Sequence, residues 1–308
     1  MNQKKTNHTG LPPVELPRDL DQYLATSEAR YNDIIPGAEK KIVWAEQAGS
    51  QTDLSLVYLH GFSATRQETA PLTEQVAQHF QANVFYTRLT GHGRSSDAML
   101  EADVDNWLAD TAEAYAIGKR LGKKVIVIAN STGATLATWL ASHATDGCLA
   151  ANILMAPNFS PRDPMARLLT WPCAKLLVRI VVGKQRYWKP DNERHARYWT
   201  NAYPSEALIP MMKLVTLVES LDKSKINTPT QVIYSPKDEV ISPSAIEQSF
   251  AQLGSTQKEL ISYLDAEDPR QHILAGDILS PTATQTLNKM ICRFVEHAVT
   301  ENAGDPCS

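Results

Sequence analysis

Short apolar runs alternate along the chain with segments whose apolar residues recur every three or four positions. The short runs are rich in β-branched residues and predict strands at 41–46, 54–60, 82–88, 124–130, 151–155, 230–234 and 259–264. The periodic segments predict helices at 67–80, 104–121, 132–143 and 282–298. The central runs are apolar at almost every position, which is typical of strands buried on both faces. The pattern therefore predicts an α/β fold with a mostly parallel central sheet flanked by helices.

Residues 158–227 interrupt this alternation, because they contain no run that predicts a strand. Two apolar helical patterns, at 164–182 and 205–221, flank an aromatic and basic stretch from Lys184 to Trp199. We expect a helical cap inserted into the body. The expected organisation is an N-terminal arm at 1–35, a body formed by 36–157 and 228–300, the cap at 158–227 and a tail at 301–308.

Composition narrows the class of protein. The 308 residues are 43% hydrophobic and 21% charged, which excludes a disordered, collagen-like or coiled-coil chain. The net charge of −4 gives no positive field for nucleic acid, and the stretch at 184–199 itself contains Asp191 and Glu193. We therefore expect that stretch to be a packed cap surface and expect no nucleic-acid partner. The four cysteines form no C-x-x-C pair, which favours thiols in a reducing compartment.

No segment has the length and polarity of a membrane anchor. The N-terminal residues lack the apolar core of a signal peptide. The most apolar stretch, 168–182, is interrupted by Pro172 and carries Lys175 and Arg179, so it is too short and too charged to span a bilayer. We expect a cytoplasmic protein without an integral membrane segment. The pattern leaves the oligomeric state open.

Ser131 lies where the predicted strand 124–130 meets the predicted helix 132–143. A serine on a sharp strand-to-helix turn, with a small residue two positions to either side, is the nucleophile-elbow arrangement. The small residues here are Ala129 and Gly133, so alanine replaces the first glycine of the usual pattern. The turn requires a positive φ at the serine, a strain of about 1–3 kcal/mol. Ser131 is therefore the candidate nucleophile, although a serine at this junction also fits a simple helix N-cap.

A serine nucleophile needs a base, and the base needs an acid that orients it. Asp238 follows the predicted strand 230–234, and His272 follows the last predicted strand. Both lie, like Ser131, beyond carboxyl ends of strands, where open α/β sheets place their sites. Glu239 is the rival acid. The acids nearest His272 in sequence are expected to form a solvated turn: Asp265, Glu267 and Asp268.

Acyl transfer also needs two N–H groups that stabilise an oxyanion, each worth about 2.7–4 kcal/mol. The backbone N–H of Thr132, directly after the candidate nucleophile, is one expected donor. The other is the N–H of Phe62, in the loop that follows the predicted strand 54–60. Gly61 allows the backbone of that loop to approach a substrate oxygen.

Together these motifs resemble the α/β-hydrolase-fold serine hydrolases, in particular the bacterial carboxylesterases and monoacylglycerol lipases. The resemblance covers residues 54–298, with 158–227 matching in position only. It implies Ser131 as nucleophile, His272 as base and Asp238 as orienting acid, and it implies an oxyanion hole formed by the amides of Phe62 and Thr132. The motifs that carry it are His60-Gly61-Phe62-Ser63, Thr90-Gly91-His92-Gly93-Arg94-Ser95, Asn130-Ser131-Thr132-Gly133, Asp238 with Val240, and His272.

The resemblance implies a carboxylic ester hydrolase that works through an acyl-enzyme, with no cofactor and no metal. Asn130 replaces the histidine common before the serine in lipases, so a C–C bond hydrolase of the same fold is one alternative. A catalytically silent binding protein of this fold is the other. Because neutral His272 is required, we expect activity to fall below about pH 6.5.

The expected partner is a small-molecule ester with an apolar acyl chain, because the helical patterns of the cap are rich in leucine and methionine. The candidate walls of the acyl pocket are Leu168, Leu169, Leu176, Leu177, Met211, Met212, Leu214 and Leu217.

Overall fold

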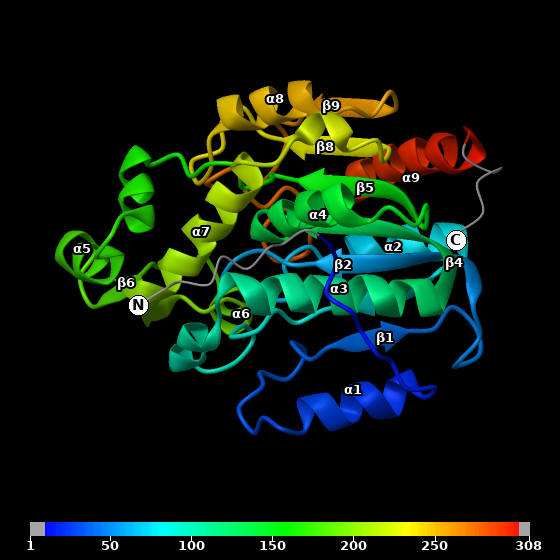
Figure 1. Ribbon diagram of the computed structural model, residues 1–308, viewed down its shortest axis with the longest axis horizontal. Coiled ribbons are helices and arrows are strands. Elements are labelled where there is room, and N and C mark those ends of the chain that lie inside the picture. Colours follow the sequence, from blue (N-terminus) through cyan, green and yellow to red (C-terminus); the bar gives the residue numbers. More distant parts are fainter. Residues whose placement is uncertain (1–9, 302–308) are drawn as a thin grey trace.

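The computed structural model describes residues 10–301, which form a central sheet with helices on both faces (Figure 1). Within these residues the sheet has seven strands in the order β1-β3-β2-β4-β5-β8-β9. Only β1 is antiparallel to its neighbour, and the other neighbouring strands pair in parallel. The predicted fold class is therefore confirmed. The strands are β1 (Lys41–Val43), β2 (Thr52–Leu59), β3 (Asn83–Tyr86), β4 (Gly122–Asn130), β5 (Leu149–Met155), β8 (Thr230–Tyr234) and β9 (Lys258–Ser262).

The helices of the body cover both faces of the sheet. In Figure 1, α3 and α4 lie on the near face, and α2 and α9 lie on the far face. Both faces of the central strands are therefore buried, which explains why β2 and β4 are apolar at consecutive positions. These helices are α1 (Leu20–Glu28), α2 (Leu72–Phe80), α3 (Val104–Leu121), α4 (Thr132–His143), α8 (Pro243–Gln252) and α9 (Ala283–Glu301), with a short 3₁₀ helix at Ser96–Glu101.

The sequence predicted α3 and α4 with their observed bounds, while other elements differ. Helix α2 starts at Leu72 rather than at residue 67, because the residue before Pro71 is biased away from helical backbone. Outside residues 158–227, two of the described α-helices were not predicted, α1 and α8. Asp19 caps α1 and Ser242 caps α8, with Pro243 at the first helical position.

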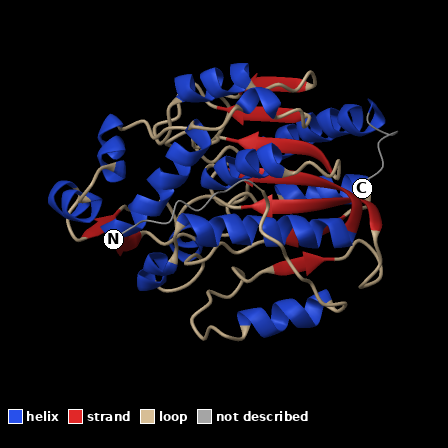
Figure 2. Cartoon of the chain, in the orientation of Figure 1, coloured by secondary structure: helices blue, strands red, loops and turns tan. Residues whose placement is uncertain are grey.

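The insertion, residues 158–227, lies at one end of the sheet, and the arrows of the parallel strands point toward it (Figure 2). The expectation that it contains no strand is wrong, because β6 and β7 form a two-stranded antiparallel sheet. Each has three residues, too few to show a period in the sequence. The elements of the insertion are α5 (Ala174–Val181), β6 (Gln185–Tyr187), α6 (Glu193–Tyr198), β7 (Ala202–Pro204), α7 (Leu208–Glu219) and 3₁₀ turns at Pro164–Thr170, Ser205–Ala207 and Lys223–Lys225.

The predicted helix at 164–182 is divided in two. A 3₁₀ helix ends at Thr170, and α5 begins at Ala174. Pro172 cannot donate a helical hydrogen bond, and Cys173 adopts a left-handed φ of 67°. The break lets the two halves turn relative to each other, so both can contribute to one cavity wall.

Two other sequence expectations concern thiols and membranes. Cys173 and Cys292 are free, but Cys148 is disulfide-bonded, so the expectation of thiols is wrong for Cys148. Between residues 10 and 301, no helix combines the length and apolar character needed to cross a membrane.

Candidate active site

Ser131 occupies the strained turn between β4 and α4, with φ 50° and ψ −114°. The turn is tight because α4 starts against the end of β2. A Cβ atom at Gly133 would lie 2.1 Å from the backbone oxygen of Leu59, so only glycine fits there. The alanine at 129 is fully buried at the end of β4, which shows that the first small position tolerates a methyl group. The hydroxyl of Ser131 is thereby held at the carboxyl end of the sheet.

Ser131, His272 and Asp238 form a continuous chain of hydrogen bonds. The Oγ of Ser131 lies 3.0 Å from Nε2 of His272, and Nδ1 of His272 lies 2.8 Å from Oδ2 of Asp238. The three residues are separated by up to 141 positions and come together because the loops after β4, β8 and β9 meet at one edge of the sheet. All three are buried.

Asp238, rather than Glu239, contacts the histidine. Oδ1 of Asp238 accepts the backbone N–H groups of Val240 and Ile241, at 2.7 and 2.9 Å, which leaves Oδ2 directed at the imidazole. The carboxyl group of Glu239 lies instead at the wall of the cavity described below.

Asp268 was expected in a solvated turn, and this expectation is wrong. Its side chain is 2% exposed. Oδ2 accepts the backbone N–H groups of His272 and Ile273, and Oδ1 accepts that of Arg270. Acidic residues that follow one another in a sequence suggest a solvated surface, and burial of one of them depends on how the loop folds back. Asp268 therefore fixes the backbone that carries His272.

The environment of His272 shifts its protonation in a definite direction. Burial alone would lower the pKa of His272, but the charge and hydrogen bond of Asp238, with the charges of Asp268 and Glu68, outweigh burial and raise the pKa above 6.5. These three carboxyl groups surround the His272 imidazole and favour its protonated form, the imidazolium.

The loop after β2 lies beside Ser131 because Leu59 pairs with Ala129 in the sheet register. Among the described residues, neither the N–H of Phe62 nor that of Thr132 donates a hydrogen bond. Both residues line the same cavity as Ser131 and His272. His60 supports this loop from within the core, since its Nε2 accepts the N–H of Leu89 and its Nδ1 lies 2.9 Å from the carbonyl oxygen of Gly61.

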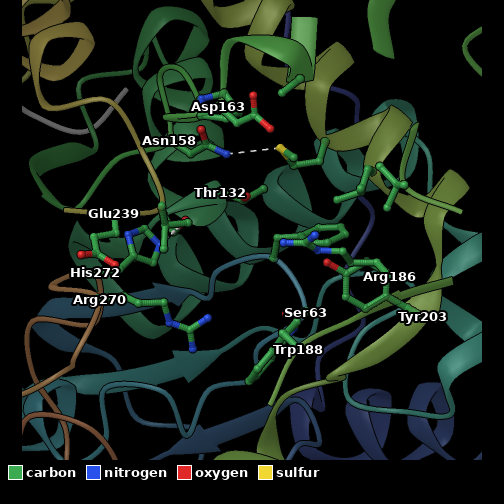
Figure 3. Close-up of a pocket in the computed structure, with 18 of the residues that line it drawn as sticks. Ser63, Thr132, Asn158, Asp163, Arg186, Trp188, Tyr203, Glu239, Arg270 and His272 are labelled. Atoms are coloured by element: carbon green, nitrogen blue, oxygen red, sulfur yellow. Dashed lines mark hydrogen bonds between the residues drawn. The ribbon is translucent and has the colours of Figure 1, made fainter. Parts of the chain in front are cut away.

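A cavity of about 430 Å³ opens over Ser131, in the size range of small-molecule sites. Figure 3 shows His272, Thr132 and Asn158 on one side, with Trp188, Arg186 and Tyr203 from the insertion across from them. Of the candidate acyl walls, the cavity is lined by Leu168, Leu169, Leu177 and Met211. The other four do not line it: Leu176, Met212, Leu214 and Leu217.

These differences follow from which helix face each residue occupies. Leu176 is 60% exposed on the outer side of α5, whereas Met212 and Leu214 are buried in the core where α7 packs against α4. The aromatic stretch supplies further walls that sequence reasoning assigned to surface packing. His195 stacks between Trp188 and Trp199, with ring centroids 4.7 Å from each, and all three line the cavity.

The parallel sheet flanked by helices and the strained serine turn are those of an α/β-hydrolase fold. A family model described as serine aminopeptidase, S33, matches residues 50–267. The chain therefore belongs to that family and is a hydrolase. Between residues 10 and 301, no group of three or more His, Cys, Asp or Glu side chains is arranged to hold a metal ion.

The chain is also similar to characterised lipolytic proteins. It is 26% identical over 209 residues to a thermostable monoacylglycerol lipase from Bacillus sp. strain H-257, which covers 68% of this chain and 80% of the relative. A structure of one of two metagenome-derived lipolytic enzymes, LipS and LipT, superposes with a TM-score of 0.70 at 19% identity, over 86% of this chain and 99% of that one. A soluble variant of monoglyceride lipase from Saccharomyces cerevisiae superposes with a TM-score of 0.62 at 13% identity, over 84% and 91%.

Proposed function

We propose that the protein hydrolyses a carboxylic ester of a small molecule through a Ser131-His272-Asp238 triad and an acyl-enzyme. The observation that carries this proposal is the chain of two hydrogen bonds, 3.0 and 2.8 Å long, that links the three side chains below an apolar cavity. The match to a hydrolase family and the similarity to a monoacylglycerol lipase support it.

In the proposed mechanism, Oγ of Ser131 attacks the ester carbonyl while Nε2 of His272 accepts its proton. Asp238 holds the Nδ1–H tautomer of the imidazole and stabilises the imidazolium. The amides of Phe62 and Thr132 stabilise the oxyanion, because their N–H groups are free to donate into the cavity. The imidazolium protonates the leaving alcohol, and a water molecule activated by His272 then releases the acid and regenerates Ser131.

The cavity supports an apolar acyl chain as the preferred acid. The insertion contributes aliphatic and thioether side chains that can pack against a hydrocarbon, beside polar residues such as Asp163 and Arg186. The apolar ones include Leu168, Leu169, Leu177 and Met211. A monoester with an apolar acyl chain is the substrate class we propose, in line with the similarity to a monoacylglycerol lipase.

The length of this cavity is expected to set the preferred acyl chain. Leu177 lines it, so Leu177→Trp should shorten the space and move the optimum among p-nitrophenyl esters to shorter chains. Leu176→Trp is the matched control, because the neighbouring Leu176 is 60% exposed and does not line the cavity. Initial rates over a series of acyl lengths measure the effect. An equal shift in both variants, or none in either, would place the acyl chain elsewhere.

The pH dependence follows from the raised pKa of His272. Only neutral imidazole can accept the proton of Ser131, and the surrounding carboxylates keep the imidazolium to higher pH than usual. The acid limb of kcat/KM is therefore expected to have its midpoint above pH 6.5, higher than the sequence alone predicted. Rates measured from pH 5 to 9 locate it.

His195 is a useful control for this pH profile. It lines the same cavity, but burial lowers its pKa below the ordinary value despite the nearby charge of Asp191. His195→Phe is expected to leave the midpoint unchanged. A wild-type midpoint at or below pH 6.5, or a flat rate across the range, would count against His272 as the base.

A further inference from the structure

A buried carboxyl group lies beneath the candidate site and is not used by the mechanism above. Glu68, in the segment between β2 and α2, is 1% exposed. Within residues 10–301, no lysine or arginine side chain forms an ion pair with it. Burying an ionisable group without a cation is costly, so its polar contacts must offset that cost.

Three donors converge on the two oxygens of this carboxyl group. Oε1 accepts the backbone N–H of Gly61 at 2.6 Å and the hydroxyl of Tyr58 at 2.9 Å. Oε2 accepts the side-chain amide of Asn130 at 3.1 Å. Gly61 directly precedes Phe62, and Asn130 directly precedes Ser131. One carboxyl group therefore joins the backbone of one candidate oxyanion donor to the residue before the candidate nucleophile.

The two segments that Glu68 joins are in close contact. A Cβ atom added at Gly61 would lie 3.1 Å from Oε2 of Glu68 and 3.3 Å from the Cβ of Ser131. A side chain at position 61 would crowd both the carboxyl group of Glu68 and the elbow, so the loop and the elbow are packed closely around that carboxyl group. Glu68 does not line the cavity and cannot contact a substrate there.

We propose that Glu68 is a positioning residue that ties the loop of Phe62 to the elbow of Ser131, so that the N–H groups of Phe62 and Thr132 point at the same substrate oxygen. This inference rests on the proposed ester hydrolysis. The two N–H groups belong to segments that follow different strands, β2 and β4, and a tie between these segments fixes the separation of the N–H groups. A misplacement of about 1 Å in such a site can cost about 100-fold in rate.

The hydrogen-bond donors around Glu68 oppose the effect of burial on its pKa without cancelling it. Burial raises the pKa of Glu68 to about 7, against the hydrogen bonds from Gly61, Tyr58 and Asn130 and the charge of His272. A proton on Oε2 would point at the amide hydrogens of Asn130, so that two hydrogen-bond donors would face each other. In return, the negative charge of Glu68 raises the pKa of His272. The charges of Asp238 and Asp268 act on His272 in the same direction.

The test is Glu68→Gln, which keeps the shape of the side chain but replaces one acceptor oxygen by an NH₂ donor. The hydrogen bond that the Asn130 amide donates to Oε2 is then lost, and a contact is restored only if that amide turns its Oδ1, which has no hydrogen-bond partner among the described residues, toward the new NH₂. We expect kcat for a p-nitrophenyl ester to fall about 10- to 100-fold while KM stays within about twofold. We also expect the acid limb of kcat/KM to move to lower pH, because one of the charges that favour the imidazolium of His272 is removed.

Glu74→Gln is the matched control. Glu74 is a partly buried glutamate on α2 whose carboxyl group acts on Tyr86, away from the cavity. It is expected to leave kcat and the pH profile unchanged. If Glu68→Gln does not fold, Asn130→Ala removes the link on the elbow side alone, and it should lower kcat in the same direction without changing KM.

Unchanged kcat in folded Glu68→Gln would overturn the proposal. So would a loss of kcat without any movement of the acid limb, accompanied by a lower melting temperature, since that result describes a purely structural residue. Failure of this inference is distinguishable from failure of the proposed function. Ester hydrolysis that depends on Ser131 upholds the proposed function whatever Glu68 does.

Discussion

Replacing Ser131 by alanine is expected to lower kcat for ester hydrolysis by about a millionfold, to the background of the uncatalysed reaction and the empty oxyanion site. The reason is that His272 and Asp238 contribute to the reaction only by activating the hydroxyl of Ser131. Its Oγ is the atom 3.0 Å from the base, and no acyl-enzyme forms without it. The turn itself should survive, because alanine is no larger than serine and Gly133 still provides the close approach to Leu59.

Ser63 offers a control from the same cavity. It lines the cavity, but its hydroxyl is not hydrogen-bonded to His272. Ser63→Ala is expected to keep measurable hydrolysis, and initial rates with a short p-nitrophenyl ester compare the two variants. Comparable activity in Ser131→Ala and the wild type would assign the nucleophile to another residue.

Asp238→Asn is expected to lower kcat by about 10⁴-fold with little change in the fold. Oδ1 of Asp238 is fixed by the N–H groups of Val240 and Ile241. The asparagine introduced there keeps its oxygen on those donors and turns its NH₂ toward Nδ1 of His272. That nitrogen must then accept, so the proton moves to Nε2, which can no longer accept a proton from Ser131.

Glu239→Gln is the matched control, because Glu239 is the adjacent acid and does not contact the imidazole. It is expected to retain far more activity than Asp238→Asn, because Glu239 lines the cavity without forming the hydrogen bond to Nδ1 of His272. The measurement is kcat at a pH well above the acid limb, with melting temperatures to show that both variants fold. A larger loss in Glu239→Gln than in Asp238→Asn would reverse the assignment of the acid.

Much of the body could be predicted because its physical causes are local. The apolar run of β4 and the periodicity of α4 are visible in the sequence, and the small residues at 129 and 133 mark the turn between them. Asp238 and His272 were singled out because each follows a strand, and parallel strands bring their carboxyl ends to one edge.

Other features depend on tertiary structure. Asp268 and Glu68 are buried carboxyl groups, and nothing in the neighbouring residues distinguishes them from solvated acids. The donors to Asp268 come from its own loop, which folds back on it, whereas Glu68 also accepts a hydrogen bond from Asn130, 62 positions away. No sequence signal marked Glu68, because residue 68 fell at the start of the helix predicted at 67–80, where an acidic residue is ordinary.

The insertion was predicted least well for a similar reason. Its strands β6 and β7 are short, and the pairing between them is non-local. Trp188 and His195 belong to a stretch whose composition suggests a surface, yet the fold turns them toward the cavity. Which residues contact a substrate is therefore decided by packing between the insertion and the body.

The most direct test of the proposed mechanism is to map where a fluorophosphonate probe attaches to the folded wild-type protein. Such probes phosphonylate a serine only where a base and an oxyanion site activate it. The account predicts one adduct per chain, on Ser131 within the tryptic peptide 125–162, and none in Ser131→Ala. An adduct on another residue, or no adduct in folded wild-type protein, would contradict it, and the second result would favour a binding protein that has kept the fold without the chemistry.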